Sequence, residues 1–131
     1  MIPNEKPSRG VAMLIWSADL SQLERVATPF VMAQAAVALE QSVEMYFTAR
    51  GTELLFGSSA ERLIGFGPQR RTIGSYLNEA RELGVELYAC SQALHALERT
   101  AADLHPVCQG LGGAVRFMER CADPAWRTLV F

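Results

Sequence analysis

The sequence has little net charge, no paired cysteines and no long apolar run, and each absence excludes a class of protein. Its 131 residues carry a formal net charge of −2, and its 12 Lys and Arg residues are scattered except for Arg70 and Arg71. No basic surface for nucleic acid is therefore predicted. The three cysteines include no CxxC pair, which argues against a disulfide framework. We expect reduced thiols and no nucleic-acid partner.

The apolar segments are too short to cross a membrane. The most apolar stretch, residues 27–39, contains Pro29 and Gln34 and falls short of the roughly 20 residues that span a bilayer. The first residues, MIPNEKPSRG, are polar and lack the apolar core of a secretory signal. We therefore expect no membrane span and a cytoplasmic location. The length fits one domain over residues 1–131, in which residues 1–9 form a polar N-terminal arm.

Short β-branched and aromatic segments alternate with segments of helical periodicity. The predicted strands are residues 11–16, 42–48, 85–90 and 126–131, with a weaker fifth strand at 106–109. The predicted helices are a main helix at 29–40 after a short helical turn, and helices at 73–83, 91–100 and 111–121. This alternation predicts right-handed βαβ crossovers. The expected fold is therefore α/β: a three-layer α/β/α sandwich with a mostly parallel sheet of about five strands.

Several local signals refine this expectation. Residues 11–16 form a nearly unbroken apolar run, as expected of a central strand that is covered on both faces. Thr28 followed by Pro29 predicts a helix cap with proline in the first turn, and Gly84 predicts a left-handed helix end. Residues 57–72 fit neither period and contain three glycines and a proline. This segment is expected to be a loop with a role in function, mobility or assembly.

Cys90 is the leading candidate for chemistry. It closes the strand at 85–89 and precedes Ser91, which can cap the next helix. In a parallel sheet this carboxyl edge gathers ligands and helix N-termini, and such a position favours the thiolate, which is a nucleophile. The alternative interpretation is that Cys90 is a small buried hydrophobic residue, as most free cysteines are.

The other two cysteines receive different interpretations. Cys108 follows the weak strand and precedes Gly110, so it could reach the same edge as a resolving thiol or second sulfur acceptor. Cys121 lies late in a helix beside Phe117 and Met118, and a structural role is favoured.

Gly110, Gly112 and Gly113 follow a strand and open a helix, where exposed amides could hold an anion. The full dinucleotide fingerprint is absent. Close packing of helix on strand is the alternative; it is favoured for Gly113, whereas Gly112 could serve either purpose.

The remaining polar candidates are few. Ser17 and Asp19 follow the first strand at the same sheet edge and could line a pocket, although Asp19 could equally cap the turn there. His95 and His105 have no CxxC partner motif, so no metal site is predicted.

Four segments together resemble the DsrE/DsrF-like family, which includes the small sulfur-relay proteins of the DsrEFH and TusBCD complexes. The resemblance covers nearly the whole chain. The segments are VAMLIWSAD, MAQAAVALE leading into SVEMYFTARGTELL, LGVELYACSQAL and GGAVRFMERCADPAWRTLVF. Where many relatives have a glycine between the first long helix and the second strand, this chain has Glu40, Gln41 and Ser42.

The resemblance implies a cysteine that carries sulfur as a persulfide between donor and acceptor proteins, and Cys90 matches its position. It also implies a homo-trimer or hexamer, with a hetero-oligomer as the alternative, and no metal or organic cofactor. The main functional hypothesis is thus a sulfur carrier or sulfurtransferase-like protein. Two alternatives stay open: a non-enzymatic module that binds a small anion or nucleotide near residues 110–113, and an assembly subunit of a hetero-oligomer.

Overall fold

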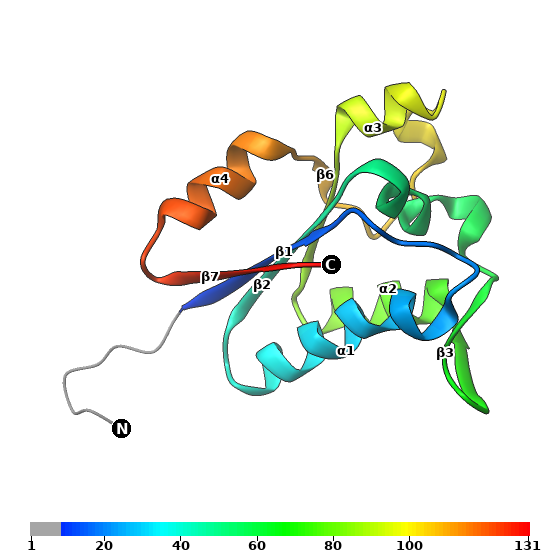
Figure 1. Cartoon of the computed structure of the whole chain (residues 1–131), viewed down its shortest axis with the longest axis horizontal. Coiled ribbons are helices and arrows are strands. Elements are labelled where there is room, and N and C mark those ends of the chain that lie inside the picture. Colours follow the sequence, from blue (N-terminus) through cyan, green and yellow to red (C-terminus); the bar gives the residue numbers. More distant parts are fainter. Residues whose placement is uncertain (1–8) are drawn as a thin grey trace.

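A computed structural model describes residues 9–131 and contains a five-stranded parallel sheet with helices on both faces (Figure 1). The strand order is β6-β5-β2-β1-β7, and every pairing is parallel. The strands are β1 (Gly10–Ile15), β2 (Ser42–Phe47), β5 (Glu86–Ala89), β6 (Gly110–Leu111) and β7 (Trp126–Val130). The predicted α/β class and parallel sheet are confirmed, and β1 is interior. Apart from Arg9, the polar arm predicted at 1–9 lies outside the described residues.

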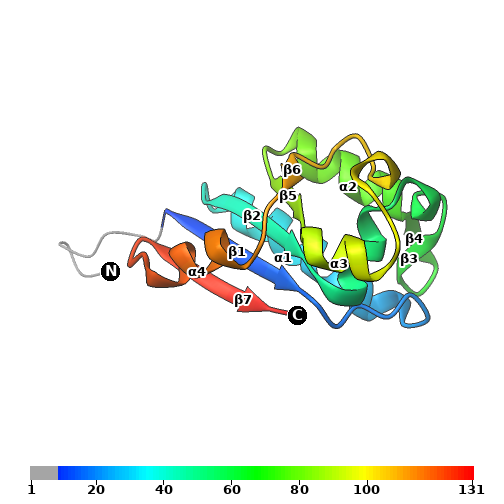
Figure 2. The same ribbon diagram turned by 90° about the horizontal axis from the view of Figure 1, so that it is seen from above.

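The helices form the outer layers. Helices α1 (Leu23–Ala38) and α2 (Ile73–Glu82) lie on one face of the sheet, and α4 (Ala114–Ala122) lies on the other (Figure 1). The short helix α3 (Ser91–Ala96) follows the carboxyl end of β5, as the view from above shows (Figure 2). Short 3-10 turns are η1 (Ala49–Leu55), η2 (Gly57–Ser59) and η3 (Ala101–Asp103). In residues 9–131, no helix is long and apolar enough to span a membrane.

Alternation along the strands divides the core into two parts. Successive side chains of a strand point to opposite faces, so Met13 and Ile15 of β1 join the large cluster under α1 and α2, whereas Ala12 joins a small cluster under α4. In the large cluster, the Phe30 ring lies 6.3 Å from the ring of Phe47 and 5.5 Å from that of Tyr76. The α4 face buries much less apolar surface, so other contacts must hold this helix.

The first helix begins earlier than predicted. Helix α1 starts at Leu23 and contains Pro29 in its interior, although proline removes one helical hydrogen bond at a cost of about 3 kcal/mol. The predicted cap at Thr28 is wrong: its hydroxyl donates to the carbonyl of Glu24 at 2.8 Å. Pro29 and Phe30 are buried against the core, which offsets the lost bond.

Two other elements also differ in extent. Helix α3 ends at Ala96 rather than near residue 100, because Glu98 adopts a left-handed conformation with φ 56°. The Arg99 amide then donates to the Leu94 carbonyl at 2.9 Å, which closes the helix end. The fifth strand is β6, which begins at Gly110. Residues 106–109, where this strand was predicted, form a turn and a short connection that leads into β6.

The predicted loop at 57–72 is largely structured. It contains an antiparallel hairpin of β3 (Leu63–Phe66) and β4 (Gln69–Thr72), and β3 packs on α1. Gly67 occupies the first turn position with φ 52°, a conformation that the tight hairpin turn requires and glycine supplies. The strands were missed because each has four residues and β4 is polar.

The turn between α1 and β2 is strained at one residue. Glu40 has φ 62°, in the left-handed region where a Cβ atom costs about 1–2 kcal/mol. This is where the sequence lacks the glycine that many members of the DsrE/DsrF-like family carry. The chain nevertheless completes the turn, since the Gln41 amide donates to the Ala36 carbonyl at 3.1 Å.

Candidate functional site

Cys90 lies at the carboxyl end of β5, which is the second strand from one edge of the sheet. Its amide donates to the Phe47 carbonyl at 2.9 Å, and its own carbonyl accepts from the Leu94 amide at 3.1 Å. Cys90 is therefore the N-cap residue of α3. Both backbone groups are fixed by hydrogen bonds, so the position of the half-buried thiol is set by the sheet.

The thiol faces a mostly apolar cavity of about 310 Å³ on the α4 side of the sheet. The lining residues come from the ends of β1, β2 and β5 and from the start of α4; they are Leu14, Tyr46, Phe47, Thr48, Cys90, Gln92, Gly112, Gly113, Ala114, Phe117 and Met118. A cavity of this size lies at the lower end of the range for small-molecule sites. The arrangement places one nucleophile among aromatic and aliphatic walls.

The N-termini of two helices, α3 and α4, adjoin this cavity. Helix α3 has only six residues, and the predicted cap Ser91 is its first residue. Helix α4 has nine residues and begins after Gly113, and the amides of its first turn have no intrahelical acceptor. Since Gly113 and Ala114 line the cavity, the positive end of α4 is directed toward the space that the thiol faces.

Helix α4 is held on the sheet by a buried carboxylate. Glu44 of β2 is only 3% exposed. It accepts two hydrogen bonds from Arg120, at 2.8 and 2.9 Å, and one from Arg116 at 3.2 Å. The Tyr46 hydroxyl donates to the same carboxylate at 2.7 Å, while Arg116 donates to the tyrosine oxygen at 3.1 Å. Two turns of α4 are thereby tied to β2.

The pKa values of this cluster follow from its contacts. Burial opposes ionisation of Glu44, but the hydrogen bonds from Arg120, Tyr46 and Arg116 outweigh it and lower its pKa to about 2. Burial and the hydrogen bond to Glu44 raise the pKa of Tyr46 well above its usual value. Burial and a bond to Glu86 raise the pKa of Tyr88 to about 12. The carboxylate thus stays charged and both tyrosines stay neutral near pH 7.

The three glycines near α4 have distinct roles. The Gly112 amide donates to the Ala89 carbonyl at 3.0 Å, and a Cβ there would lie 2.9 Å from the ring of Tyr88. Gly112 therefore packs on β5, and its amide is already engaged. The packing role predicted for Gly113 is wrong, since a Cβ there would meet nothing within 4 Å. Gly110 has φ 152° and its carbonyl accepts from the Cys108 thiol at 3.4 Å.

The two other cysteines differ in environment from Cys90. Cys108 is half-buried and packs against the large core cluster, and burial raises the pKa of its thiol although backbone contacts at Gly110 and Ala89 oppose this. It does not line the Cys90 cavity. Cys121 is exposed on α4. Of the three cysteines, Cys90 is the one that lines this cavity.

The histidines lie apart from the cysteine cavity. His95 is exposed on α3, and His105 accepts the Val107 amide through Nδ1 at 3.2 Å. Burial lowers the pKa of His105. Over residues 9–131, no cluster of three or more His, Cys, Asp or Glu side chains could hold a metal ion.

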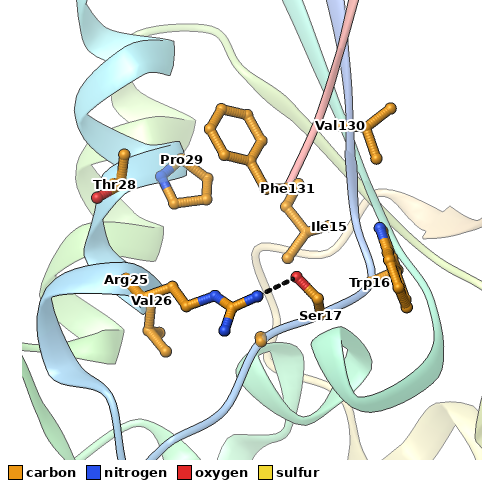
Figure 3. Close-up of a pocket in the computed structure, with 10 residues that line it drawn as sticks. Ile15, Trp16, Ser17, Arg25, Val26, Thr28, Pro29, Val130 and Phe131 are labelled. Atoms are coloured by element: carbon orange, nitrogen blue, oxygen red, sulfur yellow. Dashed lines mark hydrogen bonds between the residues drawn. The ribbon is translucent and has the colours of Figure 1, made fainter.

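Of the two polar candidates after β1, only Ser17 lines a cavity. This second cavity, of about 510 Å³, lies at the ends of β1 and β7 on the α1 side (Figure 3). Arg25 of α1 donates to the Ser17 hydroxyl at 3.1 Å. Asp19 instead accepts from the amide and hydroxyl of Ser21, at 2.9 and 2.7 Å. These bonds lower its pKa, with a smaller contribution from Arg25.

Sequence reasoning missed Arg25 and the Glu44 cluster. A signal for the cluster exists: Glu44 is the one acidic residue in an otherwise apolar strand, and Arg116 and Arg120 are spaced four residues apart on one helix, so they share a face. No comparable signal marks Arg25, because its partner Ser17 is brought near it only by the fold.

Comparison with known proteins identifies the fold. No described family and no curated protein matches the sequence. Several solved structures match, and two of them match over most of their lengths. One is MTH1491, a protein of unknown function from Methanobacterium thermoautotrophicum, with a TM-score of 0.71, 19% identity, and coverage of 92% of this chain and 97% of that one. The other is the ychN protein from E. coli, with a TM-score of 0.66, 12% identity, and coverage of 94% and 99%. Both have the DsrE/DsrF-like fold, and this chain shares that fold.

Proposed function

We propose that this protein carries sulfane sulfur as a persulfide on Cys90. The observation that carries the proposal is the position of this thiol: the sheet fixes Cys90 at its carboxyl edge, and the side chain faces an apolar cavity that also receives the first turn of α4. A thiol on a fixed backbone beside a mostly apolar cavity suits the storage of one additional sulfur atom. The shared fold with proteins of the DsrE/DsrF-like type supports the same function.

The transfer step requires no cofactor and no net oxidation. The Cys90 thiolate attacks the outer sulfur of a donor persulfide, R–S–SH. A new S–S bond forms on Cys90, the donor S–S bond breaks, and R–S⁻ leaves with the electron pair while the proton stays on the outer sulfur. In the release step, an acceptor thiolate attacks the outer sulfur of the Cys90 persulfide. The acceptor gains that sulfur, and Cys90 is the leaving group.

Intact-mass measurement after exposure to a polysulfide donor tests this proposal. The reduced wild type is compared with Cys90→Ser, Cys108→Ser and Cys121→Ser, of which the last two serve as matched controls. We expect a gain of about 32 Da for one sulfur in the wild type and both controls, and none in Cys90→Ser. Equal gain in all four proteins, or gain in none, would exclude Cys90 as the carrier.

We also propose that the protein assembles into a homo-trimer or hexamer and exchanges sulfur with donor and acceptor proteins. Large apolar side chains are exposed on β6, α4 and β7 and directly after β1; they are Trp16, Leu111, Val115, Met118, Leu129 and Val130. Strand β7 is also an edge strand, and such edges are usually covered. Sedimentation at micromolar concentration should show an oligomer, and a monomer alone would contradict this assembly.

A further inference from the structure

The second cavity lies where the path of the chain through the sheet changes direction. From β1 the chain proceeds through α1 to β2 and then outward to β5 and β6, before α4 returns it to β7 on the other side of β1. The two helices involved lie on opposite faces of the sheet (Figure 1). The place where the strand order reverses is called the topological switch point. In open parallel sheets, ligands bind there, at the carboxyl ends of the strands. The cavity occupies that place, between the ends of β1 and β7.

The cavity differs from the Cys90 cavity in location and chemistry. Ile15 lines the second cavity and Leu14 lines the first, and adjacent residues of a strand point to opposite faces. The two cavities are therefore on opposite faces of the sheet. Ile15, Val26 and Pro29 give the second cavity a buried apolar wall, and Figure 3 shows the Phe131 ring directed toward Pro29.

Two side chains supply the polar groups through which this cavity could bind a ligand. The Thr28 hydroxyl is engaged by the Glu24 carbonyl, and the Trp16 and Ser17 amides both donate to the same backbone oxygen of Phe131, at 2.9 and 3.3 Å. The two that remain are the guanidinium group of Arg25 and the hydroxyl of Ser17, which are joined by a hydrogen bond of 3.1 Å (Figure 3).

Arg25 has neutral partners. It donates to the Ser17 hydroxyl at 3.1 Å and to the Gln22 side-chain oxygen at 3.3 Å. Within the described part of the chain, no side-chain carboxylate lies at ion-pairing distance from it. Asp19 accepts hydrogen bonds from Ser21 and is near enough to Arg25 for the arginine charge to contribute to lowering the Asp19 pKa. A guanidinium group binds a carboxylate through two parallel hydrogen bonds, and the nearby hydroxyl can donate a third.

We propose that this cavity binds a small monocarboxylate with a flat or branched apolar body. The carboxylate would bind Arg25 and Ser17, and the apolar body would lie against Ile15, Pro29 and Phe131. A cavity of about 510 Å³ is within the usual range for small-molecule sites. Arg25 is the one cationic side chain in the cavity lining, so polyphosphates fit poorly. This proposal does not depend on sulfur transfer at Cys90.

Ligand titration followed by protein NMR tests the proposal, with phenylacetate and benzoate as probes. Benzamide, which is neutral, and benzylamine, which is cationic, are the matched comparison ligands. We expect saturable binding of at least one carboxylate with a dissociation constant of about a millimolar or less, and shifts in residues 15–18, 25–29 and 130–131. Benzamide and benzylamine should bind at least about tenfold more weakly.

Variants localise the site. Arg25→Gln, at an exposed position, should weaken carboxylate binding at least about tenfold, whereas Arg127→Gln on β7 should leave it unchanged. Cys90→Ser should also bind normally, which separates this proposal from sulfur transfer. Equal binding by Arg25→Gln and the wild type, shifts confined to the Cys90 cavity, or no saturable binding of either carboxylate up to about 10 mM would overturn the proposal.

Discussion

Replacing the buried carboxylate of Glu44 should destabilise the protein strongly. The substitution Glu44→Gln keeps the shape of the side chain but removes the charge that Arg116 and Arg120 share. A pKa of about 2 in the folded protein, against about 4.3 in a free chain, corresponds to about 3 kcal/mol of stabilisation near pH 7. Removing one partner of a buried ion pair costs a similar amount, about 3–5 kcal/mol.

The partial exposure of the two arginines reduces this figure. Their side chains are 44% and 28% exposed, so water can solvate them again when the carboxylate is lost. We therefore expect Glu44→Gln to lower the free energy of unfolding by about 2–3 kcal/mol, measured by urea denaturation at pH 7. Glu86→Gln is the control, because Glu86 is 45% exposed and 3.6 Å from Arg116; it should cost less than about 1 kcal/mol.

The difference between wild type and Glu44→Gln should depend on pH. Because folding lowers the pKa of Glu44, its contribution is fully present above the unfolded pKa of about 4.3. It should diminish as the pH falls from there toward the folded pKa of about 2. A cost at pH 7 no larger than that of Glu86→Gln, or a difference that stays constant down to pH 2, would refute this account of how α4 is held.

Three further predictions concern single positions. Glu40→Gly should raise the free energy of unfolding by up to about 1 kcal/mol, because it relieves the left-handed φ of 62°; a loss of stability in urea would contradict this. Gly112→Ala should cost about 1–3 kcal/mol, since its Cβ would lie 2.9 Å from a tyrosine ring, while Gly113→Ala should be nearly neutral. Cys108 should react with iodoacetamide at pH 8 more slowly than exposed Cys121, because burial raises the Cys108 pKa; mass-mapped labelling in the reverse order would be contrary evidence.

The fold was predictable because its strands and major helices carry strong local patterns. The apolar run at β1 and the strand–helix order suffice for the parallel sheet, and Gly84 marks the end of α2 with φ 85°. The errors arose where tertiary packing overrides local preference. Pro29 is tolerated inside α1 because it is buried, and the hairpin at 63–72 is stabilised by its packing on α1 rather than by its own pattern.

The candidate site was only partly predictable, for a related reason. The position of Cys90 at a strand end could be predicted, because it depends only on where one strand ends. The walls of its cavity come from β1, β2 and α4, and no local pattern predicts which side chains of distant elements meet. The same limit applies to Arg25 and Ser17, which are eight residues apart in sequence but belong to different elements.

The central claim is that Cys90 holds sulfane sulfur and can release it, and cyanolysis measures both. The protein is loaded with polysulfide, freed of excess donor and treated with cyanide, which attacks the outer sulfur of a persulfide. The S–S bond breaks, thiocyanate leaves, and the Cys90 sulfur keeps the bonding electron pair and takes up the proton of the persulfide, so Cys90 returns as the thiol. We predict about one thiocyanate per chain from the wild type and from Cys108→Ser, and none from Cys90→Ser. Thiocyanate from Cys90→Ser at the wild-type level, or none from the wild type, would contradict the account.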